Sequence, residues 1–168
     1  MTEQGTGIPR IATDLWRKAR TANVPRVVVI GVFLDARKRL LTSTFRDGVS
    51  NAVLHRPPGG GVHFGELLRE ALARELHEEL GQPATVGAPL GVFEDRFLHE
   101  GQPGHEIVHA FEATFHDPGL HGSEDLTLVD DGLHMPVGWY PVTHFAPGGS
   151  LTLCPPGLAD LLLRHDPT

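Results

Sequence analysis

Apolar residues in the first third of the chain follow patterns that predict β-strands. Residues 26–34 are rich in β-branched side chains and almost continuously apolar, which is typical of a strand buried on both faces. Two further strands are expected at about residues 39–45 and 49–55. They lie on either side of Asp47-Gly48, a dipeptide that suits a tight hairpin turn. The sheet is therefore expected to begin here.

The middle of the chain changes to the period of an amphipathic helix, expected over residues 64–80. Leucines recur there at every fourth position: Leu68, Leu72, Leu76 and Leu80. Gly81 stands where helices commonly end in the left-handed conformation, and Pro83 prevents the helix from resuming. Before the helix, residues 56–61 hold two prolines and three glycines, which predicts a loop.

Strands are expected again after this helix. Residues 88–98 and 106–115 predict a hairpin, because the turn-rich residues 99–104 separate two extended patterns. The acidic stretch at residues 117–131 predicts a loop, and residues 133–142 are expected to be extended. The second half of the chain therefore adds further strands to the sheet.

Two more helices are expected near the ends of the chain. Leucines at helical spacing predict a C-terminal helix over residues 156–164. A short amphipathic helix is expected at residues 9–20, within a peripheral N-terminal segment of residues 1–24. No internal repeat or linker divides the sequence, so residues 1–168 are expected to form a single α/β domain.

The composition is ordinary for a globular protein, and the charge bears on its partners. The chain is 40% hydrophobic and has no apolar run long enough to cross a bilayer, which argues against a membrane protein. A net charge of −7 argues against binding along nucleic acid, which depends on many contacts from lysine and arginine to phosphate. With no secretory signal pattern and a lone Cys154, the expected location is the cytoplasm.

Three carboxylates of the central helix form the main candidate for chemistry. Glu75, Glu78 and Glu79 occupy positions i, i+3 and i+4, so at roughly 100° per residue they share one helix face. Like charges at this spacing repel one another, and a bound cation would offset the cost. Carboxylate oxygens favour magnesium or manganese over zinc. Taken alone, solvated glutamates on a surface helix would account for the same residues.

The glycines that precede the helix suggest a neighbouring anion site. Gly59, Gly60 and Gly61 allow backbone N–H groups to approach a phosphate closely, next to a helix N-terminus. A metal face and a phosphate site would then adjoin, which favours phosphoryl chemistry. The alternative is that these glycines only make a turn.

The spacing of the fixed residues between positions 60 and 82 carries a family resemblance. Gly60 is followed after five residues by Glu66, and after seven more by Arg74-Glu75-Leu76. One residue later come Glu78-Glu79, and after one further residue Gly81. This pattern resembles the signature box of the Nudix hydrolases, except that Gln82 replaces the usual aliphatic residue. The resemblance implies a Nudix-like α/β/α sandwich, with a mixed β-sheet between helices.

The resemblance also implies roles for individual residues. It makes Glu75, Glu78 and Glu79 metal ligands, together with the backbone carbonyl of Gly60. Arg74 would hold the carboxylates in place, and Glu66 would support the loop and the helix through that arginine. A role for Glu66 as a favourable charge in the first helical turn is nearly as well supported.

The general base is left open by the resemblance, because family members differ in it. A glutamate of the box is one choice, with Glu79 or Glu78 favoured. A later carboxylate is the other, and the candidates are Glu106, Glu112, Glu124, Asp125, Asp130 and Asp131. For each of these, a role as a solvated surface acid is favoured over a catalytic one, because sequence does not show reach.

The function that follows is hydrolysis of a diphosphate linkage, with Mg²⁺ as cofactor and Mn²⁺ as a substitute. The expected substrate is a nucleoside diphosphate linked to another group, such as a nucleoside triphosphate or a nucleotide sugar. A Nudix-fold module that binds such a ligand without turnover is the alternative. Isomerases of the same fold rank last, since their catalytic cysteine and glutamate are not found here. Because family members often pair, the resemblance also implies a homodimer.

Overall fold

The computed structural model describes residues 24–99 and 101–164. The helix expected at residues 9–20 lies outside the described residues. Within the described part, no helix is long and apolar enough to span a membrane.

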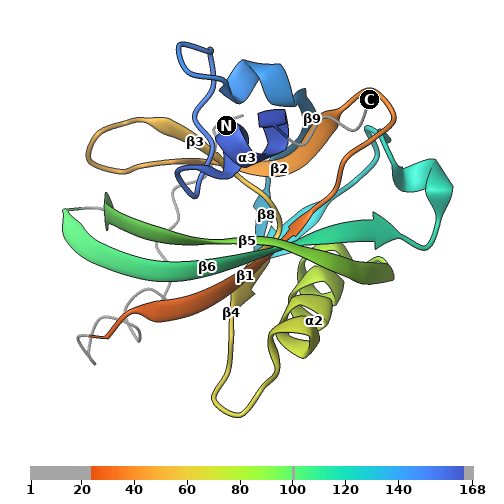
Figure 1. Ribbon diagram of the computed structural model, residues 1–168, viewed down its shortest axis with the longest axis horizontal. Coiled ribbons are helices and arrows are strands. Elements are labelled where there is room, and N and C mark those ends of the chain that lie inside the picture. Colours follow the sequence, from red (N-terminus) through yellow and green to blue (C-terminus); the bar gives the residue numbers. More distant parts are fainter. Residues whose placement is uncertain (1–23, 100, 165–168) are drawn as a thin grey trace, which may run out of the picture.

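A four-stranded mixed sheet forms the centre of the fold (Figure 1). Its strand order is β4 (Gly59–Gly61), β1 (Arg26–Val32), β6 (Gln102–Phe115) and β5 (Ala84–His99). β1 runs parallel to β6, and the other pairs are antiparallel. The long β5–β6 hairpin confirms the expected strand pair, although its strands extend into residues 99–104, where a turn was predicted.

Alternate residues of β1 build the two cores on opposite faces of this sheet. Val29 packs in the core that holds the buried residues of α2 (Leu68–Leu80), and Val28 and Ile30 pack in the core that holds α3 (Leu158–Arg164). Figure 1 shows the two helices on opposite sides of the sheet. The expected α/β/α sandwich with a mixed sheet between helices is confirmed, and so is the C-terminal helix, which begins two residues late.

A second sheet, of strands β3 (Val53–Arg56), β2 (Arg39–Arg46) and β9 (Val137–Pro141), lies beside the first. The tight turn predicted at Asp47-Gly48 is wrong, because β2 and β3 are joined by residues 47–52. The Asp47 carboxylate organises this longer loop: its Oδ1 accepts backbone N–H bonds from Val49 at 2.9 Å and Ser50 at 2.6 Å. The third strand therefore starts at Val53, later than expected.

The segment before α2 differs from its prediction in two ways. Residues 59–61, expected in a loop, form β4, because this extended backbone pairs with β1 in the register Gly60 to Val29. The helix expected from residue 64 begins at Leu68, and Phe64 lies fully exposed on the connecting loop. The helix end is confirmed, since Gly81 has φ 62° and donates its N–H to the His77 carbonyl at 3.0 Å.

In the last third of the chain, short helices and strands are found where a loop and one extended segment were predicted. The stretch predicted as a loop contains a 3₁₀ turn (Pro118–Leu120) and β7 (Leu128–Asp130). The stretch predicted as extended divides at Pro136 into β8 (Leu133–Met135) and β9, and it ends in a 3₁₀ turn (Val142–Phe145). β7 contacts α2, so this region contributes to the surroundings of the predicted site.

Candidate active site

Helix α2 places Glu79 on its buried face beside the leucines, against the backbone of β4. Leu72 and Leu76 are at most 1% exposed in the core. Glu79 is also buried, at 8% exposure, and its Oε2 accepts the backbone N–H of Gly59 at 2.8 Å. The Glu79 carboxylate thus joins the helix to β4, so Glu79 is not a solvated surface acid.

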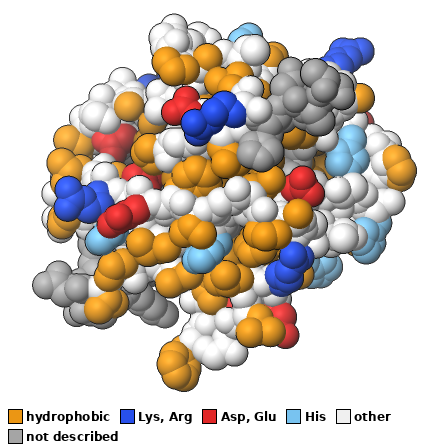
Figure 2. Space-filling view, in the orientation of Figure 1, with side chains coloured by type: hydrophobic (Ala, Val, Ile, Leu, Met, Phe, Trp, Pro, Cys, Tyr) orange, Lys and Arg blue, Asp and Glu red, His pale blue; other side chains and the backbone are white. Residues whose placement is uncertain are grey.

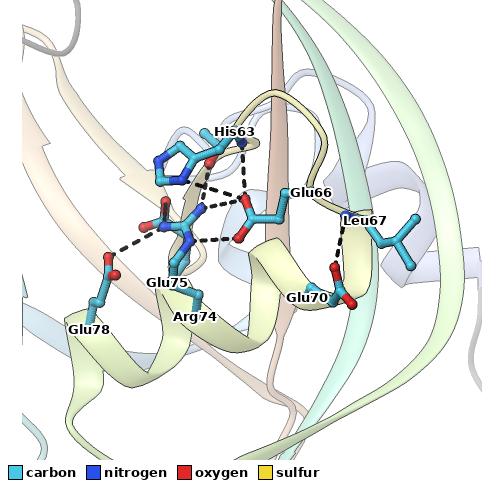
Figure 3. Close-up of polar contacts among 8 residues, drawn as sticks. His63, Glu66, Leu67, Glu70, Arg74, Glu75 and Glu78 are labelled. Atoms are coloured by element: carbon cyan, nitrogen blue, oxygen red, sulfur yellow. Dashed lines mark hydrogen bonds and ion pairs between the residues drawn. The ribbon is translucent and has the colours of Figure 1, made fainter.

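Arg74 organises the other acidic side chains around one guanidinium (Figure 3). Its Nε and Nη2 donate to the two carboxylate oxygens of Glu66 at 2.7 and 2.8 Å. Its Nη1 donates to Glu75 at 2.7 Å and to Glu78 at 3.4 Å. Nη2 also donates to the Gly61 carbonyl at 3.0 Å. A planar fork of this kind suits paired carboxylates and fixes the loop before α2 to the helix.

The bonds to Arg74 change the acidity of Glu66. The hydrogen bonds from Arg74 and from the His63 backbone lower the pKa of Glu66 to about 2. In return, the hydrogen bond to Glu66 raises the pKa of Arg74 above its usual value. Glu66 therefore stays ionised throughout the neutral and mildly acidic range.

The glycines of β4 allow the close approach between this strand and its neighbours. A Cβ atom at Gly60 would collide with the Glu75 carboxylate, and one at Gly59 would collide with the Val29 carbonyl. Gly59 also has φ 145°, a conformation that other residues rarely adopt. These glycines are therefore required because β4 packs closely against its neighbours. The open loop predicted for them is not formed.

Glu79 faces a further carboxylate that comes from β7. Burial raises the pKa of Glu79 well above its usual value, and the charge of Asp130 raises it further. Burial also raises the pKa of Asp130, while Arg56 acts in the opposite direction. Asp130 was one of several later acids in the sequence with no feature to distinguish it. Its position at the end of a short strand against α2 sets it apart.

The two other acids singled out from the sequence lie elsewhere. Glu124 is exposed, with its nearest cation at 3.7 Å in Arg39, and it contacts none of the helix glutamates among the described residues. Glu106 is buried on β6, where Arg26 and Arg56 lie 3.5 and 3.6 Å from its carboxylate. Neither joins the cluster on α2.

The donor atoms on α2 have the chemistry that a hard divalent cation prefers, but their side chains are not arranged around one point. Among the residues that the structure describes, no three acidic, histidine or cysteine side chains converge on one point closely enough to hold a metal ion. Arg74 holds Glu75, and the Gly59 N–H holds Glu79. Glu78 has a side chain that is 58% exposed and is able to turn towards its neighbours. All candidate donors are oxygens, as magnesium prefers.

Comparison with known proteins identifies the family. The family model described as "NUDIX domain" matches residues 23–152. The chain is 36% identical over 115 residues to the low-salt glycan biosynthesis protein Agl8 of Haloferax volcanii, covering 66% of this chain and 72% of that protein. It is 30% identical over 97 residues to a CTP pyrophosphohydrolase of Escherichia coli, covering 58% and 66%.

A solved structure agrees with these matches in fold. The solution structure of the Escherichia coli ORF135 protein superposes with a TM-score of 0.56 at 26% identity, covering 86% of this chain and 89% of that chain. The expected Nudix-type hydrolase acting on phosphoanhydride bonds is confirmed by the family match and its pyrophosphohydrolase relative. The chain belongs to the Nudix hydrolase family.

Proposed function

We propose that this Nudix hydrolase cleaves the diphosphate linkage of a nucleoside diphosphate joined to another group, with Mg²⁺ as cofactor and Mn²⁺ as a substitute. One observation carries the proposal most directly. Two carboxylates of α2, those of Glu75 and Glu79, lie against the glycine backbone of β4, and Glu79 is buried and bonded to it. The similarity to a CTP pyrophosphohydrolase supports a nucleotide substrate.

The residues that would hold the metal are Glu75, Glu78 and Glu79, with the backbone carbonyl of Gly60. Gly60 suits this role because its lack of a side chain leaves room for the Glu75 carboxylate beside the strand. A bound divalent cation supplies charge neutralisation for the diphosphate and activation of the attacking water. The backbone of Gly59, Gly60 and Gly61 would contact the phosphates.

Arg74 is a positioning residue in this proposal. Its guanidinium joins Glu66, Glu75 and Glu78, so their carboxylates start from defined orientations. When Glu78 turns towards a cation, Arg74 stays anchored by its two bonds to Glu66. The helix face then keeps its shape while its charge is neutralised.

The general base is proposed to be a glutamate of α2, with Glu79 favoured over Glu78. Glu79 is buried, and its burial together with the charge of Asp130 raises its pKa. A group with a raised pKa is better suited to accept a proton from water. Asp130 would help to set that acidity rather than touch the substrate.

Several finer features belong to the proposal as well. A single domain over residues 1–168 and a cytoplasmic location agree with the sequence, and the family resemblance implies a homodimer. The net charge of −7 supports a small nucleotide as partner over nucleic acid.

A hydrolysis panel tests the proposed function. Pure protein is incubated with Mg²⁺ or Mn²⁺ and nucleoside triphosphates or nucleotide sugars, and released phosphate or nucleotide is measured. The Glu79→Gln variant is expected to lose at least about a hundredfold in kcat/KM. Glu70→Gln is the matched control, because it lies on the exposed side of the same helix.

Three outcomes decide between the alternatives. Turnover that falls in Glu79→Gln and persists in Glu70→Gln supports the enzyme and the role of Glu79. Equal activity in all three proteins contradicts the role of Glu79. If no member of a broad panel is hydrolysed, the binding module without turnover becomes the better description.

A further inference from the structure

A cavity of about 290 Å³ lies away from α2, between the β2–β3 and β5–β6 hairpins and the segment that precedes α3. The tips of both hairpins lie on the same side of the molecule in Figure 1. The volume is near the lower end of the range for small-molecule sites, roughly 300 Å³. The cavity therefore suits one ring-sized part of a ligand.

Two buried acids, Asp95 and Glu106, line this cavity side by side. They are directly paired across β5 and β6, and their exposures are only 8% and 3%. Like charges at paired positions destabilise a sheet unless something compensates them. Glu106 is compensated by Arg26 and Arg56, whose guanidinium nitrogens lie 3.5 and 3.6 Å from its oxygens.

Asp95 has no comparable compensation. It makes no hydrogen bond or ion pair with the residues that the structure describes. Burial and then the charge of Glu106 raise its pKa, and the charge of Arg56 offsets this only in part. Within the same residues, every fully enclosed side-chain nitrogen or oxygen has a hydrogen-bond partner. The Asp95 oxygens therefore reach the cavity surface. A buried polar group of this kind gains from a ligand that completes its hydrogen bonds.

Arg56 offers the complementary group in the same cavity. Its side chain is 20% exposed. Among the described residues, its guanidinium pairs only with Glu106, at 3.6 Å. A guanidinium has five N–H donors in a planar fork, so donors are left for a ligand. The cavity thus presents a donor and an acceptor together.

Most of the remaining wall is apolar and partly aromatic, although Asp47, Arg96, His99 and Cys154 also line the cavity. The apolar part is formed chiefly by Phe45, Leu54, Phe97, Val108 and Pro155. Apolar side chains also gather over β5 and β6 in the middle of the face drawn in Figure 2. Such walls accept a flat ring, and a small number of polar groups then fixes its orientation.

We propose that this cavity binds the nucleobase of the substrate, and that Asp95 and Arg56 select a base with an amino group at one end of its pairing edge and a carbonyl at the other. Cytosine and guanine share this chemistry. The exocyclic amine donates to Asp95, and the carbonyl accepts from Arg56. Uracil and hypoxanthine lack the amine, and adenine lacks the carbonyl. The inference rests on the proposed nucleotide hydrolysis and names its substrate class.

Arg56 also connects the cavity to the acidic face of α2. Its charge acts on Glu106 at the cavity and on Glu79 and Asp130 at the helix. Along the chain, it precedes Gly59 of β4 by three residues. A base held against Arg56 is therefore followed by phosphates that lie towards α2.

The test compares pairs of nucleotides that differ in the amino group. The ratio of kcat/KM is measured for CTP over UTP and for GTP over inosine triphosphate, in the wild type and in Asp95→Asn. The wild type is expected to favour the amino base of at least one pair by about tenfold. The favoured pair identifies cytosine or guanine as the base. In Asp95→Asn the ratio falls towards one, because an amide also donates to a carbonyl.

A control variant and a binding measurement separate the possible failures. Asp125→Asn, at an exposed position, leaves the ratio unchanged. Calorimetry of the nucleoside monophosphates in EDTA gives the same preference without turnover. If nothing is hydrolysed but amine-selective binding persists and falls in Asp95→Asn, the inference stands and the proposed function fails. If neither measurement prefers an amino base, or if Asp95→Asn lowers both members of a pair equally, the inference is overturned.

Discussion

The acidic face of α2 and the acidic wall of the cavity solve the same problem of crowded carboxylates in different ways. On α2, Arg74 binds three carboxylates at once, and Glu78 remains 58% exposed. In the cavity, Arg26 and Arg56 both form ion pairs with Glu106, whereas Asp95 forms an ion pair with neither and feels only the more distant charge of Arg56. The first arrangement leaves room for a cation to replace Arg74 contacts. The second leaves Asp95 able to accept a hydrogen bond from a neutral donor on a ligand.

The sharpest contrast is expected between substitutions of the two cavity acids. Glu106→Leu removes the buried carboxylate that forms ion pairs with both Arg26 and Arg56, and it should lower the free energy of unfolding by about 3 kcal/mol. Asp95→Leu removes a buried carboxyl that has no hydrogen bond or ion pair within residues 24–99 and 101–164, and it should change that free energy by less than about 1 kcal/mol. Urea denaturation of both variants measures the difference. Equal losses would show that Asp95 is compensated as Glu106 is.

The glycines of β4 give the next contrast, because their neighbours differ. A side chain at Gly59 meets the Val29 backbone in a strained conformation, so Gly59→Ala should cost about 2 kcal/mol in unfolding free energy. A side chain at Gly60 meets the movable Glu75 carboxylate, so Gly60→Ala should cost less stability but more activity. Denaturation and kcat/KM on both variants test this. A larger loss of stability in Gly60→Ala than in Gly59→Ala would mean that the Glu75 side chain is rigid and that the β4 backbone adjusts.

The smallest expected effect concerns the pH dependence of Glu66. Its pKa is lowered from 4.5 to about 2, so its contribution to stability is fully present above pH 4.5 and is lost as the pH falls towards 2. The stability advantage of the wild type over Glu66→Gln should therefore be constant near neutral pH and shrink across this window. Denaturation between pH 7 and 2.5 measures it. An advantage that persists unchanged at pH 2.5 contradicts the lowered pKa.

The two regions also differ in how far the sequence predicts them. Glu75, Glu78 and Glu79 lie within five positions of one helix, so helical geometry alone predicts that they share a face. The resemblance adds their relation to Gly60, Glu66 and Arg74, and the structure brings Arg74 to Glu66 and Glu75 to Gly60. For this region, spacing along the chain was sufficient to predict which residues lie close together.

The cavity could not be predicted in this way. Asp95, Glu106 and Arg56 come from three strands, and only the register of β5 with β6 places the two acids opposite each other. Asp130 likewise became distinct through the contact of β7 with α2. The β4 strand was missed because proline and glycine favour loops locally, while pairing with β1 overrides that preference.

The central claim is that the carboxylates of α2 bind a divalent metal ion. Electron paramagnetic resonance follows the free Mn²⁺ signal during titration of the wild type, of a Glu75→Gln, Glu78→Gln, Glu79→Gln triple variant and of Glu70→Gln. The wild type and Glu70→Gln are predicted to remove Mn²⁺ from solution equally, while the triple variant removes at least about a hundredfold less at low concentration. Equal Mn²⁺ binding by the folded triple variant would contradict the metal site on α2.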